Sequence, residues 1–205
     1  VANKPILQWQ VEWLKSHGVD EFIFCIGHLK EKVIEFFGDG SAYGVRVNYV
    51  LEEKPLGTAG ALRNAAEYFA NHDEPFFFLN GDNLTNNLDL QMLRNCRDVA
   101  GTIGGLALVP LPCPYGVIYS DDAGYVTDFI EKPRLTEHWI NPGIYCLHPS
   151  VLPYLPEIGS IELDVFPILA QKKELISMRF PGSFWMSVDS PKDVEEATRI
   201  ILAQP

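Results

Sequence analysis

Residues 75–83 read PFFFLNGDN, and the two halves of this stretch set the expected fold. Pro75 to Leu79 is a short continuous apolar run, which is typical of a strand covered on both faces. Asp82 follows almost directly, and in an open parallel sheet ligands bind beyond the carboxyl ends of the strands. Carboxylate oxygens bind Mg²⁺, so Asp82 is a candidate metal ligand. The alternative is an aspartate that shapes a turn or caps a helix.

The sequence upstream repeats this strand pattern, with helical patterns in between. Phe22 to Ile26 (FIFCI) is a second apolar run, and Val45 to Leu51 (VRVNYVL) alternates between apolar and polar residues. Leu7, Val11 and Leu14 recur at helical spacing. Strands and helices that alternate in this way predict an α/β fold. We expect a Rossmann-like, mostly parallel central sheet with helices on both faces.

The texture of the sequence changes after residue 115. The runs VIYS (117–120), GYVTDFI (124–130) and GIYCL (143–147) follow one another with turns between them. They predict antiparallel strands in a smaller subregion. No linker separates the two parts, so we expect a single domain over residues 1–205, with one half at 1–114 and the other at 115–205.

Charge and composition exclude several classes of partner. The chain has 16 basic and 27 acidic residues, a formal net charge of −11. Such a surface repels phosphate backbones and anionic lipids, so we expect neither a nucleic acid nor a membrane as partner. No apolar run approaches the ~18 residues of a transmembrane span. The four cysteines form no C-x-x-C pair, and we expect them to be core residues of a cytoplasmic protein.

Two further polar segments follow predicted strands. Residues 52–62 (EEKPLGTAGAL) turn through proline and glycine into a helix, with Thr58 as its predicted N-cap. Glycines there let a flat ligand approach the backbone, and a helix N-terminus favours anionic groups. The alternative is a plain strand-to-helix turn. In residues 129–133 (FIEKP), Glu131 and Lys132 offer an acceptor for hydroxyls and a cation for a phosphate; the alternative is a solvated ion pair.

Taken together, these segments resemble the sugar-1-phosphate nucleotidyltransferase family, the NDP-sugar pyrophosphorylases. Within that family, the motifs look most like those of mannose- and heptose-type guanylyltransferases. The resemblance covers essentially the whole chain. It rests on PLGTAGAL (55–62), LNGD (79–82), YGV (115–117), FIEKP (129–133), NPGIY (141–145), Glu162 with Phe166-Pro167, and FWMSVDSPKDV (184–194).

The resemblance implies a reaction and a set of roles. In this family a sugar 1-phosphate oxygen attacks the α-phosphorus of a nucleoside triphosphate, and pyrophosphate leaves. Residues 1–114 would be the nucleotide-binding half and residues 115–205 the sugar-binding half. Asp82 would hold Mg²⁺ between the phosphates, and Lys132 would meet the phosphate of the sugar. The nucleotide pocket would be lined by Glu52, Pro55, Gly57, Thr58, Gly60 and Gly81, and the sugar would face Gly116, Glu131 and Asn141.

Two departures from the family pattern bear on activity. The family's G-x-G-T-R-L loop lies directly upstream of a stretch like the VANKPIL that opens this chain, so we expect the present sequence to lack it. The family also reads W-x-D-x-G-[TS]-P where this chain reads WMSVDSP. Ser187 therefore stands at the position of a metal-binding aspartate, and a hydroxyl is a weak ligand for Mg²⁺.

Asp189 is a candidate replacement for that ligand. Residues i and i+2 of a strand face the same side, about 6.6 Å apart, so Asp189 can point into the same cleft as Ser187. We therefore expect Asp189 to be a second metal ligand beside Asp82. The alternative is that Asp189 caps the helix predicted to begin after Ser190.

Three functions remain open on the sequence. The first is an active nucleotidyltransferase that uses Mg²⁺, in which a carboxylate at Glu52 suits guanine and favours GTP. The second is a catalytically weak or inactive paralogue that binds nucleotide sugars, which Ser187 supports. The third is a glycosyltransferase, although Gly81-Asp82-Asn83 is a poor match to a D-x-D motif. The sugar stays open, and a homo-oligomer is possible.

Overall fold

The computed structural model describes residues 1–69, 72–95, 99 and 101–203. Its central sheet has the strand order β10 (Leu175–Arg179), β5 (Gly104–Pro112), β9 (Ile144–Leu147) and β3 (Phe76–Leu79). β10 is parallel to β5, and β9 is antiparallel to both β5 and β3. Strands β3, β5 and β10 therefore point the same way, with β9 running against them.

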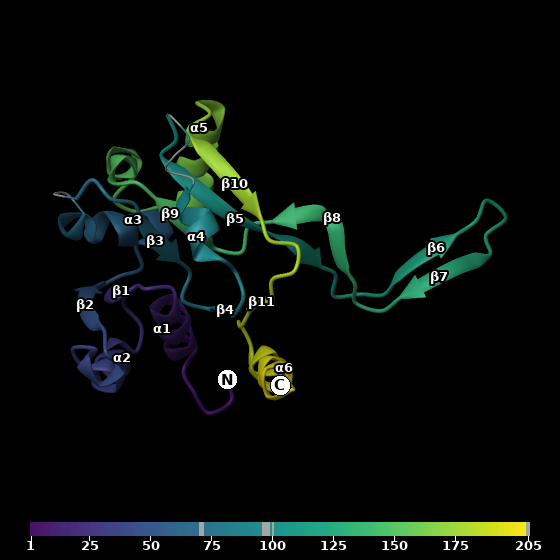
Figure 1. The fold of residues 1–205 in the computed structure, drawn as a ribbon, viewed down its shortest axis with the longest axis horizontal. Helices are drawn as coiled ribbons and strands as arrows, with labels where there is room; N and C mark the ends of the chain where they lie inside the picture. The colour runs from purple at the N-terminus through teal and green to yellow at the C-terminus, as the bar shows by residue number, and fades with distance from the viewer. Residues whose placement is uncertain (70–71, 96–98, 100, 204–205) are drawn as a thin grey trace.

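A separate parallel pair lies beside this sheet. β1 (Glu21–Ile26) pairs with β2 (Arg46–Leu51), and α2 (Lys30–Phe37) connects them (Figure 1). The strand–helix–strand order predicted from the sequence is thus present, and the expected α/β class is confirmed.

Helices cover both faces of the central sheet, as predicted. In β9, Ile144 and Cys146 belong to one buried cluster, and Tyr145 and Leu147 belong to another. This alternation follows from the period of two along a strand. The first cluster takes side chains from α1 (Ile6–Ser16), α2 and α4 (Leu90–Arg94). The second takes them from α3 (Gly57–Asn64), α5 (Phe166–Gln171) and the turns that precede α5.

The remaining elements are short or peripheral. They are the 3₁₀ turns Ser41–Tyr43, Ala66–Tyr68 and Pro149–Tyr154, the π-turn Ile161–Val165, β4 (Asn83–Thr85), β6 (Val117–Ser120), β7 (Val126–Ile130), β8 (Arg134–Ile140), β11 (Trp185–Ser187) and α6 (Pro191–Leu202).

The predicted antiparallel subregion is present, but its composition differs from the expectation. β6 and β7 form a hairpin that projects from the body of the molecule (Figure 1). β8 pairs with β5 and leads back to the body. β9, expected in the subregion, lies instead inside the central sheet. All four residues of β9 are buried, and only a strand covered on both faces can bury every side chain.

The prediction that Thr58 caps a helix is wrong. The N-cap residue of α3 is Leu56, which makes no side-chain capping bond, and Thr58 lies one residue inside the helix. Its hydroxyl donates instead to Glu162, 104 residues further along the chain, at 2.7 Å. A long-range partner has replaced the local one that the turn chemistry predicted.

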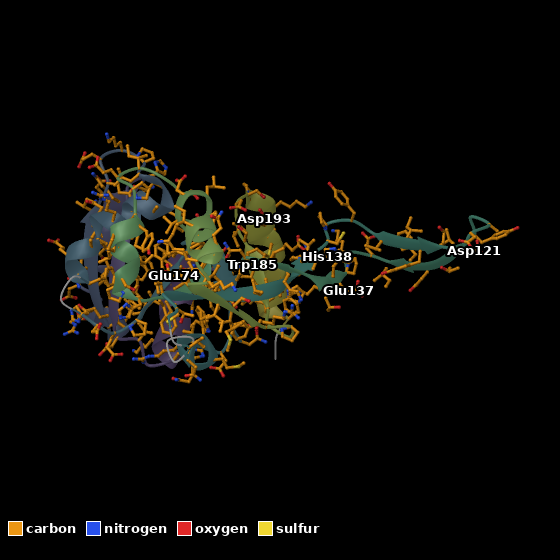
Figure 2. The ribbon with its side chains drawn as sticks, turned by 90° about the horizontal axis from the view of Figure 1, so that it is seen from above. Asp121, Glu137, His138, Glu174, Trp185 and Asp193 are labelled. Carbon is orange, nitrogen blue, oxygen red and sulfur yellow. The ribbon has the colours of Figure 1, made fainter. Side chains whose placement is uncertain are left out.

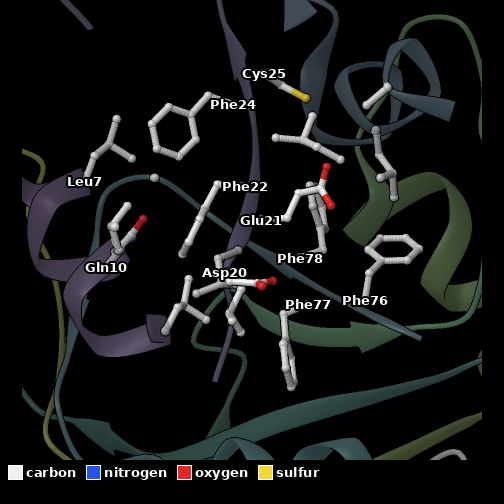
Figure 3. Close-up of a pocket in the computed structure, with 18 of the residues that line it drawn as sticks. Leu7, Gln10, Asp20, Glu21, Phe22, Phe24, Cys25, Phe76, Phe77 and Phe78 are labelled. Carbon is white, nitrogen blue, oxygen red and sulfur yellow. The ribbon is translucent and has the colours of Figure 1, made fainter. Parts of the chain in front are cut away.

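An apolar cavity of about 390 Å³ lies between β1 and β3. Figure 3 shows Phe22 and Phe24 of β1, with Phe77 and Phe78 of β3, among the side chains that line it. Within the described residues no strand pairing joins β1 to β3. Gly81 is also among the lining residues, most of which are apolar, with Gln10, Asp20, Glu21 and Arg94 as polar or charged exceptions.

None of the helices among the described residues is long and apolar enough to cross a membrane.

Candidate active site

Asp82 lies just beyond the carboxyl end of β3, where the sequence predicts a ligand site. The chain leaves β3 at Leu79 and enters β4 at Asn83, and β4 pairs antiparallel with β11. In this register Ser187 is opposite Asn83. The Val188 amide also donates to the Asp82 carbonyl at 3.0 Å. The ends of β3 and β11, about a hundred residues apart in sequence, therefore meet at Asp82.

Hydrogen bonds from Gln10 hold the turn that carries Asp82. This glutamine of α1 is buried, and its Nε2 donates to the carbonyls of Asn80 and Asn83, both at 2.8 Å. This role of Gln10 was not predicted from the sequence. A polar side chain between Leu7 and Leu14, on the apolar face of the helix, was the signal that could have found it.

Asp189 lies on the same side of the chain as Ser187. The Ser187 hydroxyl donates to Asp189 Oδ2 at 2.8 Å, so the serine orients the carboxylate two residues further on. Asp189 does not cap the following helix. The N-cap of α6 is Ser190, which forms a capping box with Asp193. The helix-capping alternative is therefore wrong for the Asp189 side chain.

The two carboxylates influence each other electrostatically. Partial burial raises the pKa of Asp82 above its ordinary value, and the negative charge of Asp189 raises that pKa further. A carboxylate whose charge is disfavoured by burial and by a neighbouring negative charge suits a divalent cation, because the cation offsets both the repulsion and the lost hydration. Among the described residues no group of three or more His, Cys, Asp or Glu side chains could hold a metal. Two carboxylates alone still fit Mg²⁺, which takes its remaining ligands from phosphates and water.

The predicted nucleotide segment packs against residues 157–160. A Cβ added to Gly57 would clash with the Gly159 carbonyl, and one on Gly60 would lie 2.6 Å from the Glu157 carbonyl. The Ala59 amide also donates to the Gly159 carbonyl at 3.0 Å. Both glycines are therefore required by close backbone packing, whatever ligand approaches from outside. Their contact with a nucleotide stays a prediction, as does that of exposed Pro55.

Glu52 shapes the start of this segment. Its Oε2 accepts a hydrogen bond from the Leu56 amide at 3.2 Å, across the turn that contains Pro55. One carboxylate oxygen is thus engaged with the turn, and the side chain is half-buried rather than free in solvent.

Pro142, the residue after Asn141, is bonded to the turn that carries Asp82. The Pro142 carbonyl accepts from Asn83 Nδ2 at 2.5 Å and from the Trp185 indole at 2.9 Å. The Asn80 amide donates to the Gly143 carbonyl at 3.0 Å. The start of β9 therefore lies against the same turn as Asp82.

Gly116, Glu131 and Lys132 lie together at the base of the projecting hairpin. A Cβ on Gly116 would lie 2.9 Å from Glu131 Oε2, so these two predicted sugar residues are neighbours. Lys132 is exposed and has a left-handed backbone, with φ of 47°. Such a conformation is costly outside glycine and is often found at functional sites. Within the described part of the chain, no hydrogen bond or ion pair joins this trio to Asp82 or Asp189.

Comparisons with known proteins identify the family of this chain. The family model described as nucleotidyl transferase matches residues 1–204. This chain belongs to the nucleotidyl transferase family. Its resemblance to that family, first stated from the motifs, is confirmed.

Two relatives in the nucleotidyl transferase family are similar over almost the whole chain. A mannose-1-phosphate guanyltransferase of Candida albicans is 36% identical over 208 residues, which cover 98% of this chain and 57% of the relative. A mannose-1-phosphate guanylyltransferase catalytic subunit beta of Drosophila pseudoobscura pseudoobscura is 38% identical, covering 94% of this chain and 53% of the relative. The chain thus spans little more than half the length of these relatives.

A solved structure shares the nucleotidyl transferase fold. The crystal structure of HddC from Yersinia pseudotuberculosis complexed with GMP-PN superposes with a TM-score of 0.69. It is 23% identical, and the match covers 96% of this chain and 84% of HddC. This likeness supports the Rossmann-like fold.

Proposed function

We propose that the protein transfers a nucleoside monophosphate from a nucleoside triphosphate to a sugar 1-phosphate and releases pyrophosphate. The observation that carries this proposal is the meeting of Asp82 and Asp189 at the carboxyl end of β3, in a chain of the nucleotidyl transferase family. The relatives named above are mannose-1-phosphate guanylyltransferases, which favours the same reaction class.

The reaction needs two anionic substrates to be held in line, with charge neutralised around the phosphates. We assign the 52–62 segment to the nucleotide, with Glu52, Thr58 and Gly81 in contact with it or directly behind it. The sugar is assigned to Gly116, Glu131 and Asn141, and its phosphate to Lys132. The division into a nucleotide half, 1–114, and a sugar half, 115–205, belongs to the same proposal.

Asp82 and Asp189 would together hold Mg²⁺. Bound there, the cation would neutralise negative charge on the phosphates. The protein's own contribution is to orient the two carboxylates. Gln10 fixes the Asp82 turn, and the Ser187 hydroxyl fixes Asp189. The loss of the aspartate at position 187 is therefore compatible with an active enzyme, and nothing in the geometry favours the inactive paralogue.

GTP is the triphosphate that Glu52 favours. One of its oxygens is engaged with the Leu56 amide, which leaves acceptor capacity for the ring N–H and amino group of guanine. Uracil and thymine lack this pair of adjacent donors. The guanylyltransferase relatives support the same choice.

The proposal also covers the setting of the reaction. We propose a cytoplasmic protein that meets small-molecule substrates and binds neither nucleic acid nor membrane, consistent with its net charge of −11. Homo-oligomerisation is part of the same expectation.

The test is pyrophosphate release by the full-length protein with Mg²⁺, a panel of nucleoside triphosphates and a panel of sugar 1-phosphates. We expect release with GTP to exceed that with UTP, dTTP or ATP by at least about tenfold in kcat/KM. Higher turnover with UTP or dTTP would overturn the choice of base. An absence of release with every pair, while nucleotide sugars still bind, would favour the inactive paralogue.

A further inference from the structure

The carboxylate of Glu162 connects the segments that the proposed function assigns to the nucleotide and to the sugar. Oε2 accepts from the Thr58 hydroxyl at 2.7 Å and from the Ser160 hydroxyl at 2.8 Å. Oε1 accepts from the Tyr145 hydroxyl at 3.0 Å. Thr58 lies in the first turn of α3, and Tyr145 lies in β9, so one side chain holds two distant elements.

Both the side chain of Thr58 and the backbone of its turn are bonded to residues 159–162, which include Glu162. The Thr58 hydroxyl donates to Glu162 and also accepts from the Ile161 amide at 2.9 Å. The backbone of the same turn is bonded to Gly159 through the Ala59 amide. A shift of residues 160–162 would therefore move the first turn of α3 with it.

On the sugar side, Glu162 is linked to the exposed side chain of Asn141 through the buried hydroxyl of Tyr145. Tyr145 is fully buried, and its hydroxyl accepts from Asn141 Nδ2 at 2.7 Å while it donates to Glu162. Asn141 Oδ1 accepts from the Gly143 amide at 2.9 Å. These bonds fix the orientation of the Asn141 amide. They leave it one N–H and one lone pair for a hydroxyl outside the protein.

Glu162 carries its charge without a cationic partner. Among the described residues no Lys, Arg or His forms an ion pair with it. Burial alone would raise the pKa of Glu162, but the bonds from Thr58 and Ser160, a backbone hydrogen bond and the bond from Tyr145 together outweigh it and lower that pKa. An ionised carboxylate that accepts all of these bonds keeps each donor pointing one way, because it has no proton to offer in return.

We propose that Glu162 is a positioning residue that couples the two substrate sites, by holding Thr58 on the nucleotide side and Asn141, through Tyr145, on the sugar side. This inference rests on the proposed function and adds a residue to it. Glu162 itself touches neither substrate. Its consequence is that a change on the nucleotide side alters the affinity for the sugar 1-phosphate, and the reverse.

The test is steady-state kinetics of the full-length protein with each substrate varied in turn. Thr58→Val removes the hydroxyl while keeping the shape of the side chain. We expect it to raise the KM for the sugar 1-phosphate about fivefold, although Thr58 reaches Asn141 only through Glu162 and Tyr145. Thr58→Ser keeps the hydroxyl and is expected to recover most of the loss.

The decisive comparison repeats Thr58→Val in a Glu162→Gln background. There the connection is already broken, so we expect no further change in the KM for the sugar 1-phosphate. A purely structural Glu162 would lower thermal stability without this dependence. Glu157→Gln is the matched control, since that side chain is exposed and its one ion pair, to Arg63, is long at 3.9 Å.

Each outcome decides the inference. An unchanged sugar KM in Thr58→Val, or an equal effect of Thr58→Val in both backgrounds, would overturn it. If Glu162→Gln does not fold, Tyr145→Phe in the same cycle breaks the connection at the buried phenol instead and makes the same prediction. Wild-type protein without any nucleotidyl transfer would contradict the proposed function itself, and this inference with it.

Discussion

At the scale of single residues, the most informative position is Ser187. The family pattern has an aspartate there, and the substitution suggests a lost metal ligand. In the structure the serine hydroxyl binds Asp189, whose charge acts on Asp82. The Ser187 hydroxyl at the end of β11 therefore orients the carboxylate two residues further along the chain.

The raised pKa of Asp82 gives a prediction for the metal-free protein. Its folded-state pKa lies above the ordinary 3.8, so the ionised carboxylate destabilises the fold, and this cost appears as the pH rises from 3.8 through the folded-state value. We expect Asp82→Asn without Mg²⁺ to raise Tm at pH 7. Solvent screening keeps the gain to about 1–2 °C.

Thermal melting of both proteins at pH 7 and at pH 3.5 checks this prediction. The gain should be much smaller at the lower pH, where wild-type Asp82 is mostly protonated in both the folded and the unfolded state. Asp122→Asn, at an exposed position beside Asp121 near the tip of the hairpin (Figure 2), should show no gain at either pH. An equal gain in Tm in the two variants would contradict the claim that the ionised Asp82 carboxylate destabilises the fold.

At the scale of elements, β11 and α6 act as one unit that presents Asp189. The Ser190 hydroxyl accepts from the Asp193 amide, and Asp193 Oδ2 accepts from the Ser190 and Asp189 amides. The capping box thus fixes the start of α6 and the backbone of Asp189 together. The serine, proline and acid of Ser-Pro-Lys-Asp predict this helix start from the sequence.

Loss of this cap should be measurable as stability. We expect Ser190→Ala to lower the free energy of unfolding by about 1 kcal/mol, because the Asp193 amide loses its side-chain acceptor and the Asp193 carboxylate loses the bond from the Ser190 hydroxyl. Chemical denaturation measures the change. Ser120→Ala, at the exposed end of β6, is the matched control, and equal stability of the two variants would count against the capping role.

At the scale of the whole molecule, the sequence predicts what local patterns can encode. The strands predicted at Phe22–Ile26 and Pro75–Leu79 are present as β1 and β3, but they are only half-buried apart from Phe22, because a cavity lies between them. The three-residue strands β4 and β11 are too short for any period, so their pairing at Asp82 was not predictable.

In the candidate site too, local patterns predict some residues, and others depend on contacts between distant parts of the chain. Asp82 follows a strong strand signal, so its place beyond the carboxyl end of β3 could be predicted from the sequence, whereas its role as a metal ligand stays a prediction. Asp189 lies beyond the end of β11, and its bond from the Ser187 hydroxyl was not predicted. Gln10 bonds the turn 70 residues away and Glu162 bonds Thr58 104 residues away, and no local pattern records such contacts. The same long-range contact explains the wrong prediction for Thr58, because a tertiary partner outcompeted the local cap.

We propose that Asp82 and Asp189 together hold the Mg²⁺ used in turnover. The most direct measurement is the Mg²⁺ concentration dependence of pyrophosphate release by full-length wild type, Asp82→Ala, Asp189→Ala and Asp122→Ala. We expect Asp82→Ala to abolish turnover, Asp189→Ala to raise the half-saturating Mg²⁺ concentration about tenfold or more, and Asp122→Ala to match wild type. An unchanged Mg²⁺ dependence in Asp189→Ala would contradict the account.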